Sequence, residues 1–226
     1  MKRYVITGTS RGVGRALALA AGEKGAHVMG VGRLSPEQEK TAFLMKEAGF
    51  SFDFFPTELT DPESISESTE QINQGGAVDV IVHNAGVIER AAVHQMSDAT
   101  WQKQMAVNLF APFAITRQLL PLMLAKARGR ILFVSSISAV LGAKQQSAYH
   151  ASKAGVVGLM RCLAEELSDS GLMTMALLPG AIDTDMLQGS GFPPRMTAEE
   201  VAATLLFYAE DASQAHQGAA VEMFGV

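Results

Sequence analysis

Residues 7–14 read Thr7-Gly8-Thr9-Ser10-Arg11-Gly12-Val13-Gly14 and lie between a short apolar run at 4–6 and an Ala- and Leu-rich stretch. Glycine permits a tight turn and lets the backbone approach a ligand closely. The free N–H groups and the dipole at the start of a helix attract a phosphate. The segment therefore predicts a strand, a phosphate-binding turn and a helix over 13–24. An ordinary strand-to-helix loop is the alternative, because a glycine-rich turn alone is weak evidence.

The rest of the chain alternates short apolar runs with longer helical patterns. The apolar runs are nearly continuous, as in strands buried on both faces, so we expect parallel strands. Strands that alternate with helices form right-handed crossovers and a doubly wound sheet. We predict one Rossmann-like α/β/α domain over residues 1–226, with ligands beyond the carboxyl ends of the strands. The predicted strands are 4–6, 27–31, 51–55, 78–82, 130–134 and 173–178. The predicted helices are 13–24, 36–48, 61–73, 98–126, 147–168 and 197–210.

The composition predicts a soluble protein of a reducing compartment. The chain has 226 residues, is 48% hydrophobic and carries a net charge of -5, which argues against a nucleic-acid or anionic membrane surface. No apolar run approaches the roughly 20 residues that cross a bilayer, and no signal-peptide pattern is present. Cys162 is the single cysteine, so no internal disulfide can form. We expect a cytoplasmic protein that binds no nucleic acid, no membrane and no metal.

Three downstream residues, Ser136, Tyr149 and Lys153, could move a proton. Tyr149 and Lys153 are four apart on a predicted helix and share a face, where the ammonium can bias the phenol. A nearby cation and an oxidised nicotinamide would lower the phenol pKa from about 10, which suits an acid or base in carbonyl–alcohol chemistry. Ser136 would hydrogen-bond the substrate oxygen, with Ser135 and Ser138 as competitors. For the tyrosine and lysine alone, a solvated surface pair is the simpler interpretation.

The order of the motifs resembles that of the short-chain dehydrogenase/reductases, in their single-domain branch, from residue 2 to about residue 187. The glycine spacing is TGxxxGxG, not the GxGxxG of the general dinucleotide fingerprint. The further matching motifs are His83-Asn84-Ala85-Gly86, Asn108, Ser136, Tyr149-His150-Ala151-Ser152-Lys153, and Pro179-Gly180 followed by Thr184.

This resemblance implies an NAD(P)-dependent enzyme with Asn108, Ser136, Tyr149 and Lys153 as catalytic residues. Lys153 would also bond the nicotinamide ribose. The residues implied around the cofactor are Gly8, Ser10, Arg11, Gly12, Val13, Gly14, Arg33, Glu58, Leu59, Asn84, Ala85, Gly86, Tyr149, Lys153, Pro179, Gly180, Ile182 and Thr184.

Asn108 lies within the long predicted helix, four residues before Pro112. Proline has no N–H, so it leaves the carbonyl of Asn108 free and kinks the helix. In the family this carbonyl holds a water that passes protons toward the lysine, and the resemblance implies the same relay here. Two helices broken at Ala111, with Asn108 as a simple cap, are the alternative.

The end of the second predicted strand indicates the cofactor. An acid there would bond the adenosine ribose and repel a 2′-phosphate, whereas an arginine accommodates the phosphate. The chain has Gly32 and Arg33 at this point and a second cation, Arg11, in the glycine turn; two guanidinium groups can clamp a phosphate. We predict NADP(H), with NAD(H) less favoured, and reduction as the direction in a cell. Ser10 and Ser35 would add hydroxyl bonds.

Three positions depart from the family pattern. Glu58 stands where an Asp near the adenine is common, so the backbone of Leu59 could make that contact instead. His83 replaces the first Asn of the NNAG motif, with little expected loss. After Thr184 only a short stretch, including 189–194, precedes the next helix, where relatives with steroid, sugar or acyl-carrier substrates usually carry a longer helical lid.

The short lid predicts an open pocket and a small or flat, fairly apolar ketone, aldehyde or dicarbonyl as substrate, with Tyr149 as the proton donor. The short lid, together with residues 1–12 and the sequence around Asn108, also resembles the sepiapterin and benzil reductases. The expected pocket residues are Val87, Ile88, Ser138, Leu141, Met186, Leu187 and Phe192.

The sequence also allows other functions. An NADP-sensing module without turnover usually loses the tyrosine or the lysine, and this chain keeps both. An alcohol dehydrogenase working in the oxidative direction would use the same residues. An extended-branch epimerase or dehydratase would have another glycine spacing. The resemblance further implies a homodimer or homotetramer that pairs the helices 98–126 and 147–168, where Ala151, Ala154 and Gly158 permit close packing.

Overall fold

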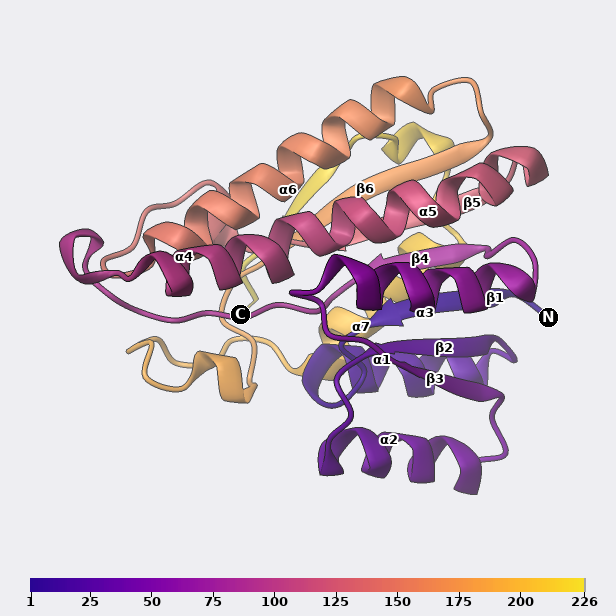
Figure 1. Ribbon diagram of the computed structural model, residues 1–226, viewed down its shortest axis with the longest axis horizontal. Coiled ribbons are helices and arrows are strands. Elements are labelled where there is room, and N and C mark those ends of the chain that lie inside the picture. Colours follow the sequence, from indigo (N-terminus) through magenta and orange to yellow (C-terminus); the bar gives the residue numbers. More distant parts are fainter. Residues whose placement is uncertain (226) are drawn as a thin grey trace.

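The computed structural model describes residues 1–225, and these residues form one parallel sheet flanked by helices (Figure 1). Its seven strands lie in the order β3-β2-β1-β4-β5-β6-β7. Every neighbouring pair is parallel, so all carboxyl ends face one edge. The order reverses between β1 and β4, where a doubly wound sheet opens its ligand crevice. The strands are β1 Arg3–Thr7, β2 His27–Gly32, β3 Phe52–Pro56, β4 Val80–His83, β5 Gly129–Val134, β6 Leu172–Pro179 and β7 Ala220–Met223.

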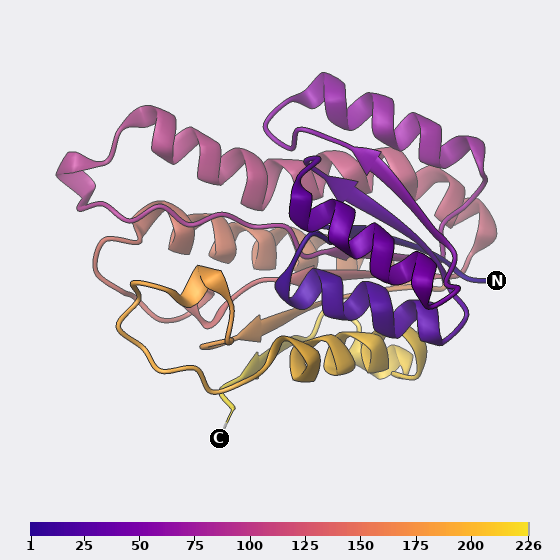
Figure 2. The ribbon, with the colours of Figure 1, turned by 90° about the horizontal axis from the view of Figure 1, so that it is seen from below.

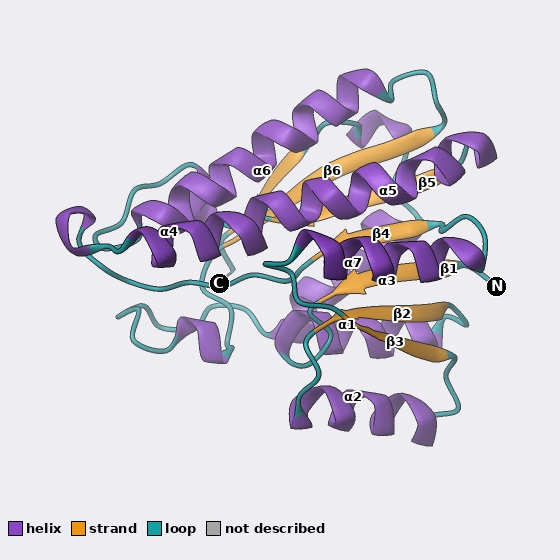
Figure 3. Ribbon diagram, in the orientation of Figure 1, coloured by secondary structure: helices purple, strands orange, loops and turns teal. Residues whose placement is uncertain are grey.

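Helices cover both faces of the sheet (Figures 2 and 3). Apolar residues of α1, α2 and α7 bury against one face, and those of α3, α5 and α6 bury against the other. Each layer therefore has its own core, and the predicted three-layer α/β/α architecture is confirmed. The helices are α1 Gly12–Glu23, α2 Pro36–Glu47, α3 Pro62–Gln74, α4 Asp98–Met105, α5 Ala111–Lys126, α6 Ser147–Glu166 and α7 Ala198–Glu210.

Strand β7 was not predicted from the sequence. It has four residues, lies at the edge of the sheet and is only partly buried, so its apolar signal is short and weak. The other strands and the helices lie within about two residues of their predicted bounds, the usual uncertainty of element ends.

The long helix predicted over 98–126 is continuous, but its middle turn, Ala106–Phe110, is a π turn that joins α4 to α5. The N–H of Ala111 reaches back to the carbonyl of Ala106 across this wider turn. The helix therefore absorbs the missing N–H of Pro112 by widening, not by breaking. The alternative of two helices broken at Ala111, with Asn108 as a cap, is wrong.

By length and composition, the same helix is apolar enough to cross a membrane, although the sequence showed no uninterrupted run of that length. Half of its most apolar window is buried inside the protein. Ile115, Leu119 and Met123 are fully buried in the core under the sheet. Part of the apolar character of the helix is thus that of a core helix.

Candidate active site

The glycine turn joins β1 to α1, and its glycines are required by its shape. Gly8 and Gly12 have φ of +76° and +53°, a region that favours glycine. A Cβ on Gly14 would collide with the carbonyl oxygen of Gly8, so this glycine lets the turn close on itself. Arg11 precedes α1 and its side chain does not cap the helix, which leaves the first N–H groups for an anion. This cradle fits a pyrophosphate. Val13 anchors the turn in the core.

The segment after β4 is tied directly to the glycine turn. The amide nitrogen of Asn84 donates to the carbonyls of Thr7 and Gly8, at 3.0 and 3.1 Å. The hydroxyl of Thr7 accepts the N–H groups of Asn84 and Ala85, both at 3.0 Å. The two motifs, far apart in sequence, therefore form one rigid floor at the switch point of the sheet.

His83 ends β4 and has a structural role. It is buried, stacks on Phe133 with the ring centroids 4.8 Å apart, and its Nε2 lies 2.7 Å from the hydroxyl of Thr116. Burial lowers the pKa of His83 to about 3, so the ring is neutral at ordinary pH. That its substitution for asparagine costs little activity stays a prediction.

Tyr149 lies on α6 and is almost fully buried. Burial raises the pKa of its phenol above the usual value of about 10, while the hydroxyl of Ser136 and the charge of Arg90 act in the opposite direction. The net shift is upward. Lys153 was expected to lower this pKa, but the cation that does so in the protein is Arg90. The phenol is therefore protonated at neutral pH.

Lys153 is buried one helical turn after Tyr149. Its Nζ donates to the carbonyl of Val134 at 2.8 Å and lies 5.7 Å from the centroid of the tyrosine ring. Burial lowers the pKa of Lys153 to about 8. A Cβ on Gly86 would come within 3.4 Å of the same Nζ, so glycine keeps the space beside the lysine open. The simple interpretation of a solvated tyrosine–lysine pair is wrong.

The serines after β5 have separate partners. Ser135 donates to the carbonyl of Lys153 at 2.9 Å, so its hydroxyl is engaged in holding α6. Ser136 accepts the N–H of Ser138 at 3.1 Å and remains the serine that interacts with the phenol of Tyr149. The arrangement favours Ser136 over its two neighbours as the group beside the substrate oxygen.

Asn108 lies in the π turn and its side chain is fully engaged. The amide bonds the N–H and carbonyl of Val87, at 2.8 and 2.9 Å, and donates to the hydroxyl of Ser152 at 3.0 Å. The side chain therefore positions the loop after β4. The relay through its backbone carbonyl stays a prediction.

The residues expected to bind the adenosine end of the cofactor are exposed or already bonded to other groups. Arg33 is exposed after β2. Arg11 forms an ion pair of 2.6 Å with Asp185, so it must exchange partners to bind a phosphate. The hydroxyl of Ser35 accepts the N–H of Gln38 at 3.2 Å and caps α2. The expected phosphate bond from Ser35 thus competes with a helix cap.

Glu58 is exposed and bends back on its own loop. Its carboxylate accepts the N–H and the hydroxyl of Thr60, at 3.1 and 2.8 Å. Leu59 is buried in the core. This geometry favours the backbone of Leu59 over the Glu58 carboxylate for a contact with the adenine.

The segment after β6 faces the glycine turn. Gly180 donates its N–H to the carbonyl of Met223 at 2.8 Å, so β7 fixes the start of this segment just after Pro179. Ile182 forms an isolated bridge with the residue before Thr197. A Cβ on Gly12 would lie 3.2 Å from the methyl of Thr184. The segment after β6 therefore lies close to the glycine turn, and its part in binding the cofactor stays a prediction.

The lid itself is short. Between Pro179 and Ala198, the described chain has one helical piece, the 3-10 turn Asp185–Leu187. Phe192 is 63% exposed, Leu141 55% and Met186 40%, whereas the other expected pocket residues are half-buried. The expected pocket is therefore open toward these three side chains.

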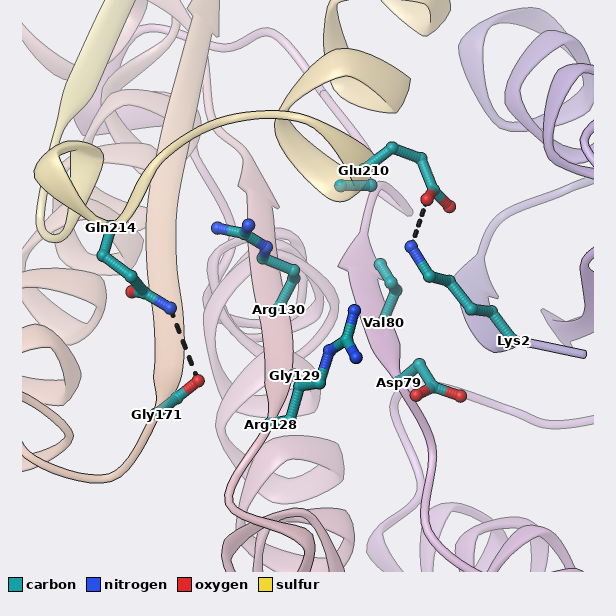
Figure 4. Close-up of a pocket in the computed structure, with 10 residues that line it drawn as sticks. Lys2, Asp79, Val80, Arg128, Gly129, Arg130, Gly171, Glu210 and Gln214 are labelled. Carbon is teal, nitrogen blue, oxygen red and sulfur yellow. Dashed lines mark hydrogen bonds and ion pairs between the residues drawn. The ribbon is translucent and has the colours of Figure 1, made fainter.

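A separate cavity lies at the opposite edge of the sheet, near the amino ends of β1, β4 and β5 (Figure 4). Its charged groups are largely paired: Lys2 with Glu210, and Asp79 with Lys126 outside the view. It contains none of the predicted site residues. Within residues 1–225 no group of His, Cys, Asp and Glu could hold a metal ion.

Sequence reasoning missed two residues of the site, Arg90 and Gln104. Gln104 is fully buried and bonds the N–H and carbonyl of Glu89, both at 3.2 Å. Arg90 carries a charge that reaches Tyr149. The available signal was a polar pair, Glu89-Arg90, directly after the motif at 83–86.

Comparisons with known proteins agree with this geometry. The chain matches the family described as short chain dehydrogenase over residues 2–191. It is 34% identical, over 240 residues, to the 3-oxoacyl-(acyl-carrier-protein) reductase of Thermotoga maritima, covering 99% of this chain and 96% of that protein. The Escherichia coli reductase of the same name is 32% identical over 186 residues, covering 82% and 75%.

Solved structures give the same result. A proposed NAD(P)-dependent gluconate 5-dehydrogenase of Beutenbergia cavernae, with bound NADP, has a TM-score of 0.91 at 31% identity and covers 98% of this chain and 94% of its own. A proposed gluconate dehydrogenase of Agrobacterium tumefaciens has a TM-score of 0.91 at 26% identity, with the same coverage. The narrower resemblance to sepiapterin and benzil reductases stays a prediction. The chain belongs to the short-chain dehydrogenase family and is an NAD(P)-dependent oxidoreductase.

Proposed function

We propose that the protein reduces a carbonyl group to an alcohol with NADPH, and that Tyr149 donates the proton. The observation that carries this proposal is the buried, protonated phenol between Ser136 and Lys153. A general acid must hold its proton at the working pH, and burial secures that state. A module that only senses NADP does not require a buried proton donor.

The chemistry follows from the positions of these groups. NADPH, when bound, supplies the hydride. The hydroxyls of Ser136 and Tyr149 hold the substrate oxygen, and the phenol passes its proton to that oxygen as negative charge develops there. Lys153, with a pKa of about 8, can then return a proton to the phenolate. The carbonyl of Asn108 would extend this route toward water.

The cofactor preference is assigned to Arg33 and Arg11. The solved relative with bound NADP supports it, as does the absence of an acid at the end of β2. We expect NADPH to be preferred over NADH by at least about tenfold in kcat/KM, since a charge-assisted bond contributes about 1.5–3 kcal/mol. Arg33→Asp should erase or reverse the preference in steady-state assays. Equal use of both cofactors by the unaltered protein would contradict the assignment.

The substrate is proposed from the short lid. Relatives of this chain are named for acyl-carrier substrates and for gluconate, which differ widely. A short lid with exposed Phe192 and Met186 offers few contacts beyond the reacting centre. We infer a small or flat carbonyl compound with a mainly apolar body.

A panel of ketones, aldehydes and dicarbonyls, scored by NADPH oxidation, tests this function. Compact aromatic carbonyls should be reduced broadly, and acyl chains on a carrier protein should be poor substrates. Phe192→Ala should raise KM for aromatic substrates without changing NADPH binding. Exclusive activity on carrier-bound 3-oxoacyl groups would overturn the proposed substrate class.

We also propose a homodimer formed by the α4–α5 helix and α6. An apolar groove lined by Met105, Leu109, Phe110, Phe113 and neighbouring side chains lies on this side. Exposed small residues, Ala151, Ala154 and Gly158, mark one face of α6. An exposed groove lined by apolar side chains is typical of an interface. Sedimentation of the intact protein at twice the mass of the chain, or four times it for a tetramer, would support the assembly.

A further inference from the structure

Arg90 lies on the loop that follows β4, and this loop is held in place by side chains. Asn108 bonds both backbone polar groups of Val87, and buried Gln104 bonds both backbone polar groups of Glu89. The N–H of the residue after Arg90 donates to a carbonyl of the loop that precedes α6, at 3.0 Å. Hydrogen bonds thus hold Val87 and Glu89 before Arg90 and Ala91 after it, so the backbone at Arg90 is fixed.

The guanidinium of Arg90 reaches toward the lid but is poorly satisfied there. Its terminal nitrogens lie 3.5 Å from the carbonyl oxygens of Gln188 and Met186, at the long limit for hydrogen bonds. Its Nε is buried and has no hydrogen-bond partner. A buried donor in this state costs free energy, and in a native protein it calls for a partner.

No carboxylate of residues 1–225 forms an ion pair with Arg90. The acid beside it in the loop, Glu89, pairs with Lys103, and the acid at the start of the lid, Asp185, pairs with Arg11. The acids flanking Arg90 are therefore engaged elsewhere, and its charge is left for a ligand.

The same charge reaches the catalytic centre. Arg90 lowers the pKa of the Tyr149 phenol, against the effect of burial. The charge of Arg90 therefore acts on the proton donor, while its terminal nitrogens lie against the lid carbonyls of Gln188 and Met186. The side chains expected along this space, Val87, Ile88 and Leu187, are apolar and half-buried. The pocket thus combines an apolar wall, one proton donor and one unpaired guanidinium.

We propose that Arg90 binds a carboxylate of the substrate, so that the carbonyl compound reduced here is an oxo acid with a mainly apolar body. A guanidinium presents parallel N–H donors that match the two oxygens of a carboxylate. Binding would exchange two long bonds to lid carbonyls for charge-assisted ones. This inference rests on the proposed carbonyl reduction and adds the class of substrate.

Matched pairs of compounds test it. We would measure KM for 2-oxo-2-phenylacetate and 4-oxo-4-phenylbutanoate, each beside its uncharged methyl ester, with saturating NADPH. The unaltered enzyme should bind at least one acid about tenfold or more better than its ester. Arg90→Gln should bring that ratio close to one, and Arg90→Lys should retain part of it. Arg128→Gln, which removes an arginine at the opposite edge of the sheet (Figure 4), should leave the ratio unchanged.

Two results would overturn the proposal: equal KM for both acids and their esters, or an Arg90→Gln variant that raises KM for acids and esters by the same factor. The second result would assign Arg90 to holding the lid. A binding measurement tests the anion site independently of the proposed reaction. Calorimetric titration with phenylacetate, which cannot be reduced, should show binding that phenylacetamide lacks and that Arg90→Gln loses. If this binding is found while no carbonyl compound is reduced, the proposed function fails and the anion site stands.

Discussion

A Tyr149→Phe variant is expected to bind NADPH as the unaltered protein does and to lose about 10²–10⁴-fold in kcat. The substitution keeps the aromatic ring, which is packed in the core beside Ser136, and removes only the hydroxyl that carries the proton. NADPH affinity from fluorescence titration and kcat from NADPH oxidation separate binding from chemistry. Loss of kcat with unchanged affinity is the expected pattern.

Tyr208→Phe provides the matched control, because it removes a phenol hydroxyl from α7 on the other face of the sheet. That variant should keep its kcat. If Tyr149→Phe retains turnover, the proton donor lies elsewhere, and His150 is the next group to test. Its Nε2 is buried without a partner, and burial lowers its pKa. A His150→Gln change in the Tyr149→Phe background would then show whether it has taken over.

The architecture could be predicted because it depends on periodicity and on glycine. Continuous apolar runs identified the buried parallel strands, and the spacing of the glycines identified the turn in which Gly14 meets the carbonyl of Gly8. The order of motifs predicted that Ser136, Tyr149 and Lys153 lie together; in the fold Lys153 bonds the carbonyl of Val134 at the end of β5, and Ser136 follows that strand. Strand β7 was not predicted, because an edge strand of four residues has little apolar pattern.

The partners of individual charges could not be predicted. Arg11 was assigned to a phosphate, yet in the fold it meets Asp185, which is 174 positions away in the sequence. Lys153 was expected to control the phenol, but burial shifts both groups and Arg90 acts on Tyr149 instead. Such effects depend on desolvation and on loop geometry, and neither leaves a local signature in the sequence. For Arg90, the polar pair Glu89-Arg90 marked the position in the sequence, but only the fold shows that its charge acts on Tyr149.

Lys153→Met is expected to abolish turnover and to change how stability depends on pH. Burial lowers the pKa of Lys153 from 10.5 to about 8, so the unfolded chain binds more protons than the folded one between these values. The free energy of unfolding of the unaltered protein should therefore rise with pH across this window, and the charged lysine costs on the order of 3 kcal/mol at pH 7. Methionine has no charge to desolvate, so the variant lacks this part of the rise.

Two opposing effects set the difference in free energy of unfolding between Lys153→Met and the unaltered protein at neutral pH. Removing the buried charge stabilises the variant by about 3 kcal/mol, whereas leaving the carbonyl of Val134 without its Nζ donor costs about 1–3 kcal/mol. The net gain at pH 7 is therefore small, but the advantage of the variant should fall by about 2.5 kcal/mol between pH 7 and pH 10, as denaturant unfolding at each pH would measure. Lys144→Met, at an exposed lysine, should follow the unaltered protein throughout. Parallel curves for Lys153→Met and the unaltered protein would show that the catalytic lysine is not desolvated in the fold, and its assigned role in returning protons to Tyr149 would lose its physical basis.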